Sequence, residues 1–286
     1  MSNVVRKLRP CFNLVKGYSN VEGRKGTRHV IQSVDRAARV LFALQGERRL
    51  GIAELAIRLE LAPSTVHGIV KTLAAHYLVV QDPGSGRYQL GPAVLRLGNV
   101  YLDTLELRSR AVSWSEELAR RTGMAVRTGV LAGEDMVIIH HEPRPDGSRQ
   151  MHETGIVIPA HASALGKAQL AFLPAEAERV LASAHRSMTG ETITDAAELR
   201  EQLSSVARTA LAEEKDEAVL GESSVAAPVF GAHGTAIGAI AVVLPTTDWP
   251  VGEPVRDALR EAARNVSREL GAMRWPAQST WQALST

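Results

Sequence analysis

The 286-residue chain predicts an α+β fold in two parts, a small helical part that carries one hairpin and a larger part that mixes helices with hairpin-connected strands. Three observations predict it. Two short amphipathic helices with a tight turn between them occupy residues 52–73. A turn-rich hairpin follows directly at residues 77–90. From residue 108 onward, helical segments are mixed with β-rich runs that short turns connect.

Apolar residues recur at helical spacing in both helices of the pair, at Ile52, Leu55, Ala56 and Leu59 and then at Val66, Ile69, Val70 and Leu73. Pro63 opens the second helix, where its missing N–H would be unpaired in any case. The polar face of this helix carries short donors and acceptors, one cation and a glycine that removes bulk, namely Ser64, Thr65, His67, Gly68 and Lys71. Such a helix can read a DNA groove. The pair alone leaves open an ordinary helical hairpin in a core.

The segments around the pair favour DNA binding. Residues 77–81 and 87–90 are expected to form strands around the turn at 82–86, which makes a wing. Arg87 is expected near the wing tip, within reach of a phosphate or a narrow minor groove. Before the pair, Ser33 is expected to cap a helix whose shared face holds Val34, Ala37, Leu41 and Leu44. Residues 29–91 therefore predict a winged helix-turn-helix.

Charge is spread unevenly along the chain. Residues 1–28 hold seven Lys or Arg against Glu22 alone, and residues 29–92 hold seven basic and five acidic side chains. Because the whole chain carries a formal net charge of +2, the remainder is mildly acidic. Positive charge at one end is expected when that end meets a polyanion such as double-stranded operator DNA.

Residues 1–28 show no sustained helical or alternating pattern, and they are interpreted as either a flexible basic arm or an inert extension. They contain no apolar run with a cleavage site, and no stretch of the chain is apolar enough to span a membrane. Cys11 is the only cysteine, so an intrachain disulfide and a thiolate metal cage are excluded. A cytoplasmic protein without a membrane partner is the simplest expectation.

Residues 92–110 are expected to form a linker helix that is too apolar to stand alone, either paired with its counterpart in a second subunit or packed on its own chain. The larger part is expected at 111–275, before a tail at 276–286. Its expected helices are 111–121, 162–172, 174–184, 196–213 and 254–272, and its expected strands are 125–131, 136–141, 223–230 and 236–244. Hairpin-connected strands among these helices indicate one mainly antiparallel sheet.

Four sequence motifs follow one another along the chain, at 31–37 (IQSVDRA), 86–91 (GRYQLG), 159–168 (PAHASALGKA) and 224–229 (SVAAPV). In these segments the chain resembles the isocitrate lyase regulator (IclR) family of bacterial transcription factors, over roughly residues 30–271. Within the family it resembles the regulators of glycerol operons most, in segments 46–51, 95–99 and 140–150. The resemblance implies a winged helix-turn-helix, a GAF-like effector domain, and dimers that often pair into tetramers on DNA. It predicts a repressor of a catabolic operon.

The resemblance also implies where a small-molecule effector binds. The matching positions are His161, Ala162, Ser163 and Ala164 at the start of a small-residue helix, and later Glu214, Ser224, Ala241 and Val243. Carboxylate-binding members have hydroxyls at the positions of Ala241 and Val243, so a polyol, a sugar phosphate or a more apolar ligand stays open. Glycerol or glycerol 3-phosphate is the effector that the likeness implies.

The two glycerol-based ligands require different surroundings. A phosphate would need the helix start and a cation, with Arg127, Arg144 or Lys167 as candidates. Glu214 repels an anion but accepts hydrogen bonds from hydroxyls, so it favours a neutral polyol unless a cation lies beside it.

Enzyme chemistry finds little support. Gly166 and Lys167 resemble part of a phosphate loop, but His161 and Ala168 replace the glycine and hydroxyl that such a loop needs. The histidines His140, His141, His152 and His161 do not show three aligned metal ligands, so we expect no metal and no cofactor. They are expected to be exposed or hydrogen-bonded, and Lys167 to be a solvated or dimer-contact cation. The alternative function is a small-molecule-binding or hydrolytic module with an attached DNA-binding head, which turnover without DNA dependence would reveal.

Overall fold

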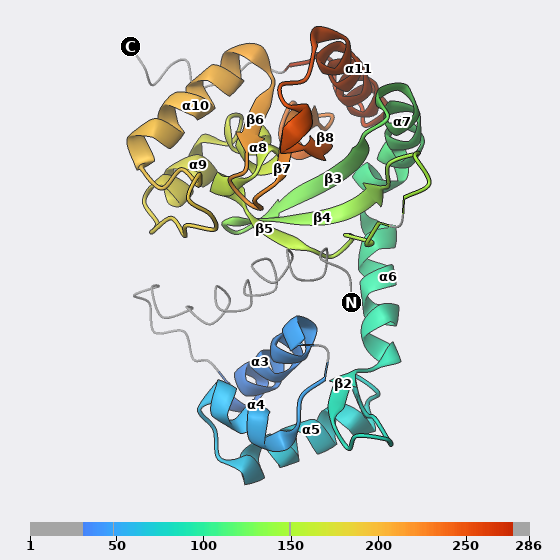
Figure 1. Ribbon diagram of the computed structural model, residues 1–286, viewed down its shortest axis with the longest axis vertical. Coiled ribbons are helices and arrows are strands. Elements are labelled where there is room, and N and C mark those ends of the chain that lie inside the picture. The colour runs from blue at the N-terminus through green and yellow to red at the C-terminus, as the bar shows by residue number, and fades with distance from the viewer. Residues whose placement is uncertain (1–30, 48, 149, 277–286) are drawn as a thin grey trace. The chain divides into compact units, whose positions relative to one another are not determined.

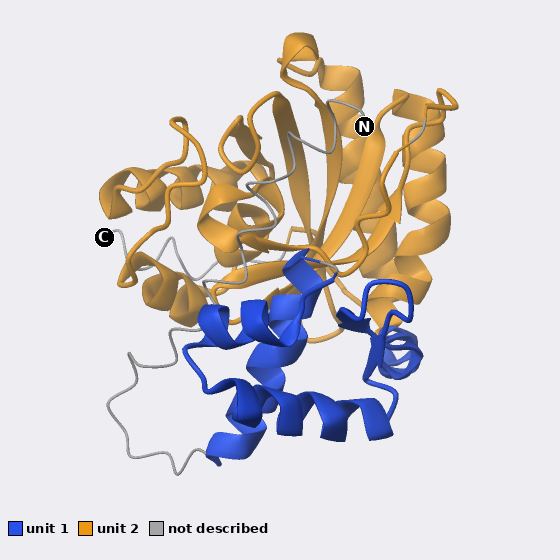
Figure 2. Ribbon diagram, turned by 60° about the horizontal axis from the view of Figure 1, so that its bottom comes forward, with its two compact units in different colours: residues 1–104 blue, residues 105–286 orange. Residues whose placement is uncertain are grey.

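The computed structural model describes residues 31–47, 49–148 and 150–276. The chain divides into two compact units, residues 1–104 and 105–286 (Figure 2). The basic arm expected at residues 1–28 lies outside the described residues, and so does the tail beyond Pro276. In the described part of the chain, no helix is long and apolar enough to cross a membrane.

The described part of the first unit begins with three helices, α3 (Gln32–Glu47), α4 (Ile52–Leu59) and α5 (Pro63–Ala75) (Figure 1). Their apolar faces meet in one core that includes Val40, Leu44, Leu55, Val66 and Val70. Pro63 occupies the first turn of α5, as expected.

The start of α3 corrects two expectations. The N–H groups of Val34 and Asp35 both donate to the carbonyl oxygen of Ile31, so the helix begins before Ser33 and Ser33 is not its cap. Val34 is 63% exposed, because the buried face of α3 begins more than a turn later at Val40.

The wing is an antiparallel pair of three-residue strands, β1 (Val79–Gln81) and β2 (Tyr88–Leu90). Leu50 adds an isolated bridge to Tyr88, which ties the wing to the segment before α4. Gly91, the residue after β2, packs against the backbone of Tyr77. A Cβ atom at position 91 would lie 2.1 Å from the carbonyl oxygen of Tyr77. Only glycine allows this approach, and the chain then enters α6 (Pro92–Thr104).

The second unit is built on one six-stranded antiparallel sheet in the order β5-β4-β3-β8-β7-β6. The strands are β3 (Ala125–Ala132), β4 (Asp135–Glu142), β5 (Val157–Pro159), β6 (Ala212–Lys215), β7 (Glu222–Phe230) and β8 (Ala236–Pro245). One face is covered by α7 (Glu106–Thr122) and α11 (Glu253–Glu269), as Figure 1 shows. A short helix η4 (Thr246–Asp248) follows β8.

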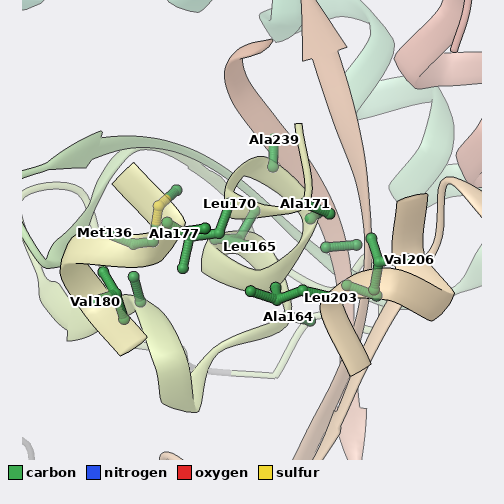
Figure 3. Packing of buried hydrophobic residues seen from close by; sticks show 14 of the residues in the cluster. Met136, Ala164, Leu165, Leu170, Ala171, Ala177, Val180, Leu203, Val206 and Ala239 are labelled. Atoms are coloured by element: carbon green, nitrogen blue, oxygen red, sulfur yellow. The ribbon is translucent and has the colours of Figure 1, made fainter. Parts of the chain in front are cut away.

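The opposite face of the sheet is covered by η3 (Ala160–Ala162), α8 (Ala164–Leu170), α9 (Pro174–Leu181) and α10 (Ala196–Thr209). Small residues let α8 pack directly on strands β6, β7 and β8. Ala164 and Ala168 of α8 belong to the same buried cluster as Ala226, Ala239 and Ala241 of the sheet, and Leu165, Leu203 and Val206 fill the space around them (Figure 3). We call this side of the sheet the α8 face.

Two strands depart from the sequence expectation. The helix expected at 196–213 ends at Thr209, where Ala210 adopts a left-handed conformation with φ of 53°, and residues 212–215 form the edge strand β6 instead. Strand β5 at the other edge was not expected. The small-residue helix is also shorter than expected, because residues 160–162 form the separate turn η3.

Candidate functional site

The polar face of α5 is open to solvent. Ser64, His67 and Lys71 are exposed at positions that share one side of the helix, and Thr65 beside them is half-buried. Gly68 lies between them, and no heavy atom of the described residues comes within 4 Å of the place where its Cβ would stand. The helix can therefore approach another surface closely along this side.

Arg87, directly before the returning strand β2, is held by the first helix of the pair. Its Nη2 donates to Glu54 Oε1, and Glu54 Oε2 accepts a hydrogen bond of 2.7 Å from the Gly51 N–H. One carboxylate thus caps α4 and holds the wing arginine. The Arg87 side chain is still 46% exposed, so it can contact a phosphate from solvent. An exposed ion pair of this kind is weak, so a phosphate can also replace Glu54 as the partner of Arg87.

Arg49 holds the wing from its other end. Its Nε donates to Gln89 Oε1 at 3.0 Å, and its Nη1 lies 3.2 Å from Asp82 Oδ2. The hydrogen bond from Ser85 and the charge of Arg49 together lower the pKa of Asp82 below its ordinary value. Two arginines therefore fix the wing against the segment at 47–54.

The start of the small-residue helix is already occupied by its own contacts. Ser163 caps α8, and its Oγ accepts a hydrogen bond of 3.0 Å from the Gly166 N–H. His161 Nε2 lies 3.1 Å from the carbonyl oxygen of Arg186, and its ring stacks on His185 with 4.8 Å between centroids. Burial lowers the pKa of His161 to about 4. The side-chain cap satisfies one of the N–H groups at this helix start, and binding of an anion there stays a prediction.

Glu214 and Ser224 meet on the α8 face. Ser224 Oγ donates to Glu214 Oε1 at 2.9 Å, and the Glu217 N–H donates to Glu214 Oε2 at 3.1 Å. Strand register places Val243 directly opposite Ser224, so Glu214, Ser224 and Val243 form one row across β6, β7 and β8. Burial raises the pKa of Glu214 to about 8 despite these hydrogen bonds.

Lys167 is buried and ion-paired, which corrects the expectation of a solvated or dimer-contact cation. Its Nζ lies 2.5 Å from Glu217 Oε1, and its side chain is 1% exposed. All seven residues of α8 are buried between the sheet and the surrounding segments, and Lys167 is one of them. Because the Glu217 N–H also binds Glu214, Lys167 connects α8 to the Glu214–Ser224 pair.

Arg127 on β3 binds two carboxylates. Its Nη1 and Nη2 donate to Glu222 on β7 at 2.7 and 3.0 Å, and its Nη2 and Nε donate to Glu153, the former at 2.8 Å. Burial alone would lower the pKa of Arg127, but the charges of Glu222 and Glu153 raise it above its ordinary value. His141, the neighbour of Arg127 on β4, is 97% buried at its side chain, and its Nδ1 has no hydrogen-bond partner among the described residues.

The described residues contain no group of three His, Cys, Asp or Glu side chains that could hold a metal ion. Register explains part of this: His141 is paired with Arg127 and His140 with Thr128, so the two histidines point to opposite faces of the sheet. Arg144 is the third cation that could bind a phosphate. Its Nε lies 4.0 Å from Asp146 Oδ2, and its side chain is partly exposed.

Two family models match the chain. The IclR helix-turn-helix domain matches residues 33–83, and the bacterial transcriptional regulator IclR C-terminal domain matches residues 99–268. This chain belongs to the IclR family of bacterial transcription regulators. It is 44% identical over 250 residues to the glycerol operon regulatory protein of Streptomyces griseus, and 40% identical to that of Streptomyces coelicolor. Each alignment covers 86% of this chain and 98% of the relative.

A solved structure of an IclR transcriptional regulator from Alicyclobacillus acidocaldarius has the same fold, with a TM-score of 0.72 and 29% identity over 84% of this chain and 99% of that one. The expected α+β fold with an N-terminal winged helix-turn-helix is thereby confirmed, and so is the expected class of DNA-binding transcription regulator.

Several polar residues of this IclR-family chain were not expected from the sequence. Glu54 and Arg49 fix the wing, and Glu153 and Glu222 bind Arg127. Glu54 had a local signal, since it stands three residues after Gly51 before an apolar run. Glu153 and Glu222 had none, because they lie 26 and 95 residues from Arg127 in the sequence.

Proposed function

We propose that this chain is a repressor of a glycerol-type catabolic operon, that it binds double-stranded operator DNA as a homodimer or tetramer, and that a small neutral polyol controls it. The names of the two Streptomyces relatives support the operon type. As a protein that binds chromosomal DNA, it would act in the cytoplasm.

The proposed DNA contacts are Ser64, Thr65, His67, Gly68, Lys71 and Arg87. The open polar side of α5 and the half-exposed Arg87 on the wing support them. In this proposal Lys71 and Arg87 meet phosphates, which gives affinity, and the first turns of α5 meet base edges, which gives sequence preference.

The proposed effector positions are His161, Ala162, Ser163, Ala164, Glu214, Ser224, Ala241 and Val243. One observation carries the choice of a neutral polyol over a phosphate: Arg127 and Lys167, the two buried cations considered for a phosphate, are already ion-paired with carboxylates of the chain. A phosphate would have to displace those carboxylates. Hydroxyl groups can donate to the carboxylates without displacing them.

The effector proposal is tested by thermal unfolding with glycerol and with glycerol 3-phosphate, because a ligand that binds only the folded state raises the unfolding temperature. We expect glycerol to stabilise the protein more than glycerol 3-phosphate at equal concentration. Ser224→Val should abolish this response and leave DNA affinity unchanged. A larger shift with glycerol 3-phosphate would contradict the neutral-polyol proposal.

The DNA proposal is tested by the salt dependence of binding to a duplex that the protein itself selects from a random library. Lys71→Ala and Arg87→Ala should each weaken binding and reduce the slope of log affinity against log salt by about one per lost phosphate contact. Arg120→Ala, which removes an exposed arginine of α7, is the matched control and should leave the slope unchanged. If Lys71→Ala and Arg87→Ala both keep the salt slope of the wild-type protein, the proposed phosphate contacts of these two residues are wrong.

A further inference from the structure

The ion pair between Arg127 and Glu222 has to cross a strand. Arg127 lies on β3 and Glu222 on β7, and β8 runs between these strands in the sheet. Register pairs Arg127 with Ala241 and pairs Glu222 with Pro245. Since alternate residues share a face, all these side chains project on the α8 face. The line from the Ala241 row to the Pro245 row passes over Val243.

The bridge therefore passes over Val243, one of the two β8 positions at which the family resemblance places ligand contacts, while Ala241 packs in the buried cluster under α8. Ala241 is 1% exposed and Val243 is 5% exposed. Apolar side chains at both positions place no unpaired hydroxyl beside the guanidinium.

The bridge and the Glu214–Ser224 pair form one continuous polar surface. Glu222 and Ser224 are two residues apart on β7 and face the same way, and the charge of Glu222 contributes to the raised pKa of Glu214. Glu153 continues the surface on the other side of Arg127, and His141 Nε2 lies 3.8 Å from its Oε2. The donors of Arg127 therefore lie between the carboxylate acceptors of Glu222 and Glu153.

The chemistry of this surface suits neighbouring hydroxyl groups. Each carboxylate oxygen of Glu222 and Glu153 accepts one hydrogen bond from Arg127 and can accept another. Two hydroxyls on adjacent carbons can donate to such oxygens together. An anion would find the guanidinium already neutralised by two carboxylates.

We propose that the Arg127–Glu222 bridge, rather than the neighbouring β8 side chains Ala241 and Val243, is the element that recognises a vicinal diol in the effector. The inference rests on the proposed polyol response. It names the hydroxyl pattern that is read and the residues that read it.

The test compares three probes, glycerol, 1,2-propanediol and 1,3-propanediol, by calorimetry and thermal unfolding of the full-length protein. The last probe lacks adjacent hydroxyls. We expect glycerol and 1,2-propanediol to bind more tightly than 1,3-propanediol. Polyols stabilise proteins non-specifically at high concentration, but that effect is common to all variants, so differences between variants report the site.

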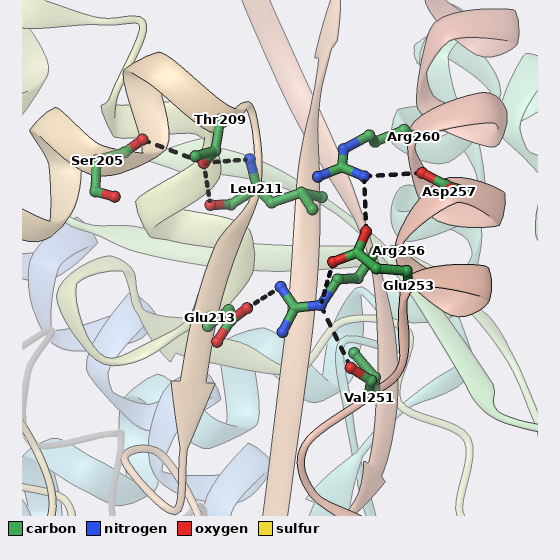
Figure 4. A network of polar contacts seen from close by, with 9 residues as sticks. All are labelled: Ser205, Thr209, Leu211, Glu213, Val251, Glu253, Arg256, Asp257 and Arg260. Atoms are coloured by element: carbon green, nitrogen blue, oxygen red, sulfur yellow. Dashed lines mark hydrogen bonds and ion pairs between the residues drawn. The ribbon is translucent and has the colours of Figure 1, made fainter.

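Glu222→Gln keeps the size of the side chain and removes its charge, and it should weaken glycerol binding about tenfold or more. Glu213→Gln is the matched control. Glu213 is also a sheet carboxylate paired with an arginine, but it points away from the α8 face and binds Arg256 of α11, as Figure 4 shows. This control should bind glycerol within about twofold of wild type. Val243→Thr, beneath the bridge, should also stay within about twofold.

The outcomes separate the inference from the proposed function. If wild-type protein binds none of the three probes, the polyol effector is wrong and the inference falls with it. If wild type binds glycerol but Glu222→Gln binds as tightly, or 1,3-propanediol binds as well as 1,2-propanediol, the inference alone is overturned. A larger loss of glycerol affinity in Val243→Thr than in Glu222→Gln would show that the β8 side chains, and not the bridge, recognise the ligand.

Discussion

Glu214 illustrates how burial sets the properties of a single residue. It accepts two hydrogen bonds, yet it is 4% exposed and has Glu217 and Glu222 nearby. Burial is the largest cause that raises its pKa to about 8 from the ordinary value of 4.5. A protonated Glu214 can also donate a hydrogen bond, which widens the range of hydroxyl orientations it can bind.

The raised pKa predicts how stability depends on pH. Between pH 4.5 and about 8 the folded chain keeps the Glu214 proton while the unfolded chain loses it, so this residue costs the folded state increasing stability as pH rises. We expect Glu214→Gln, which cannot ionise, to gain unfolding temperature relative to wild type as pH rises from 5 to 8. The gain should level off above about pH 8.

The measurement is thermal unfolding of both proteins in buffers of constant ionic strength. His161, whose pKa is lowered to about 4, is present in both proteins and cancels in the comparison. A difference in unfolding temperature that stays constant from pH 5 to pH 9 would show that Glu214 does not titrate as described.

Among the elements, the wing depends on one close backbone approach. Gly91 → Ala would place a Cβ atom 2.1 Å from the carbonyl oxygen of Tyr77, a backbone atom that cannot move alone. We expect the substitution to destabilise the helix-turn-helix unit by about 2 kcal/mol or more. Gly68→Ala in α5 meets nothing within 4 Å and should stabilise the same unit by about 0.5–1 kcal/mol.

Denaturant unfolding without DNA, followed by a probe in the first unit, measures both changes. Because both variants are Gly→Ala in one unit, the effect on the unfolded chain is the same and the difference reports the folded state. Equal stability of the two variants would mean that the wing adapts without cost.

Periodicity predicted the long elements well and the short edge elements poorly. The apolar spacing of α4 and α5 and the turns around β3 and β4 lead directly to the observed elements. Strand β6 has the sequence AEEK, which favours a helix locally, and it is extended only because it pairs with β7. Strand β5 has three residues, too few for a pattern.

In the candidate site, local motifs likewise located some residues, whereas residues that depend on distant partners could not be placed. Motifs located Glu214, Ser224 and Ser163, and their roles in binding stay predictions. Lys167 could not be placed from sequence, because burial of a lysine depends on a partner 50 residues away. The bridge of Arg127 to Glu222 likewise depends on the order of three strands in the sheet, which local sequence does not encode.

At the scale of the whole molecule, the linker predicted at 92–110 divides between the two units, with α6 in the first and the start of α7 in the second. Helix α6 exposes large apolar side chains at Leu95, Leu97, Val100 and Tyr101. Exposed apolar residues clustered on one short helix indicate a contact surface. The domain limits and the proposed pairing of subunits stay predictions.

We expect the protein to be a dimer or tetramer at micromolar concentration, and the double variant Leu97→Asp with Tyr101→Asp to shift it toward smaller species, because two charges would be buried in the interface. Ile57→Asp is the matched control, since Ile57 of α4 is 80% exposed. Light scattering coupled to size exclusion measures the masses. A wild-type monomer, with and without DNA, would contradict the proposed assembly.

The crossing of β8 by Arg127 also has a consequence for how this protein can diverge. A large side chain at position 241, which is paired with Arg127 and buried under α8, would crowd the arginine and the α8 cluster, and loss of the arginine would leave the partly buried Glu153 and Glu222 without this counter-charge. A substitution at position 127 or 241 alone is therefore expected to be destabilising. We therefore expect descendants to keep arginine with a small residue, or to exchange both together, so that a change of effector class requires a coupled step through less stable intermediates.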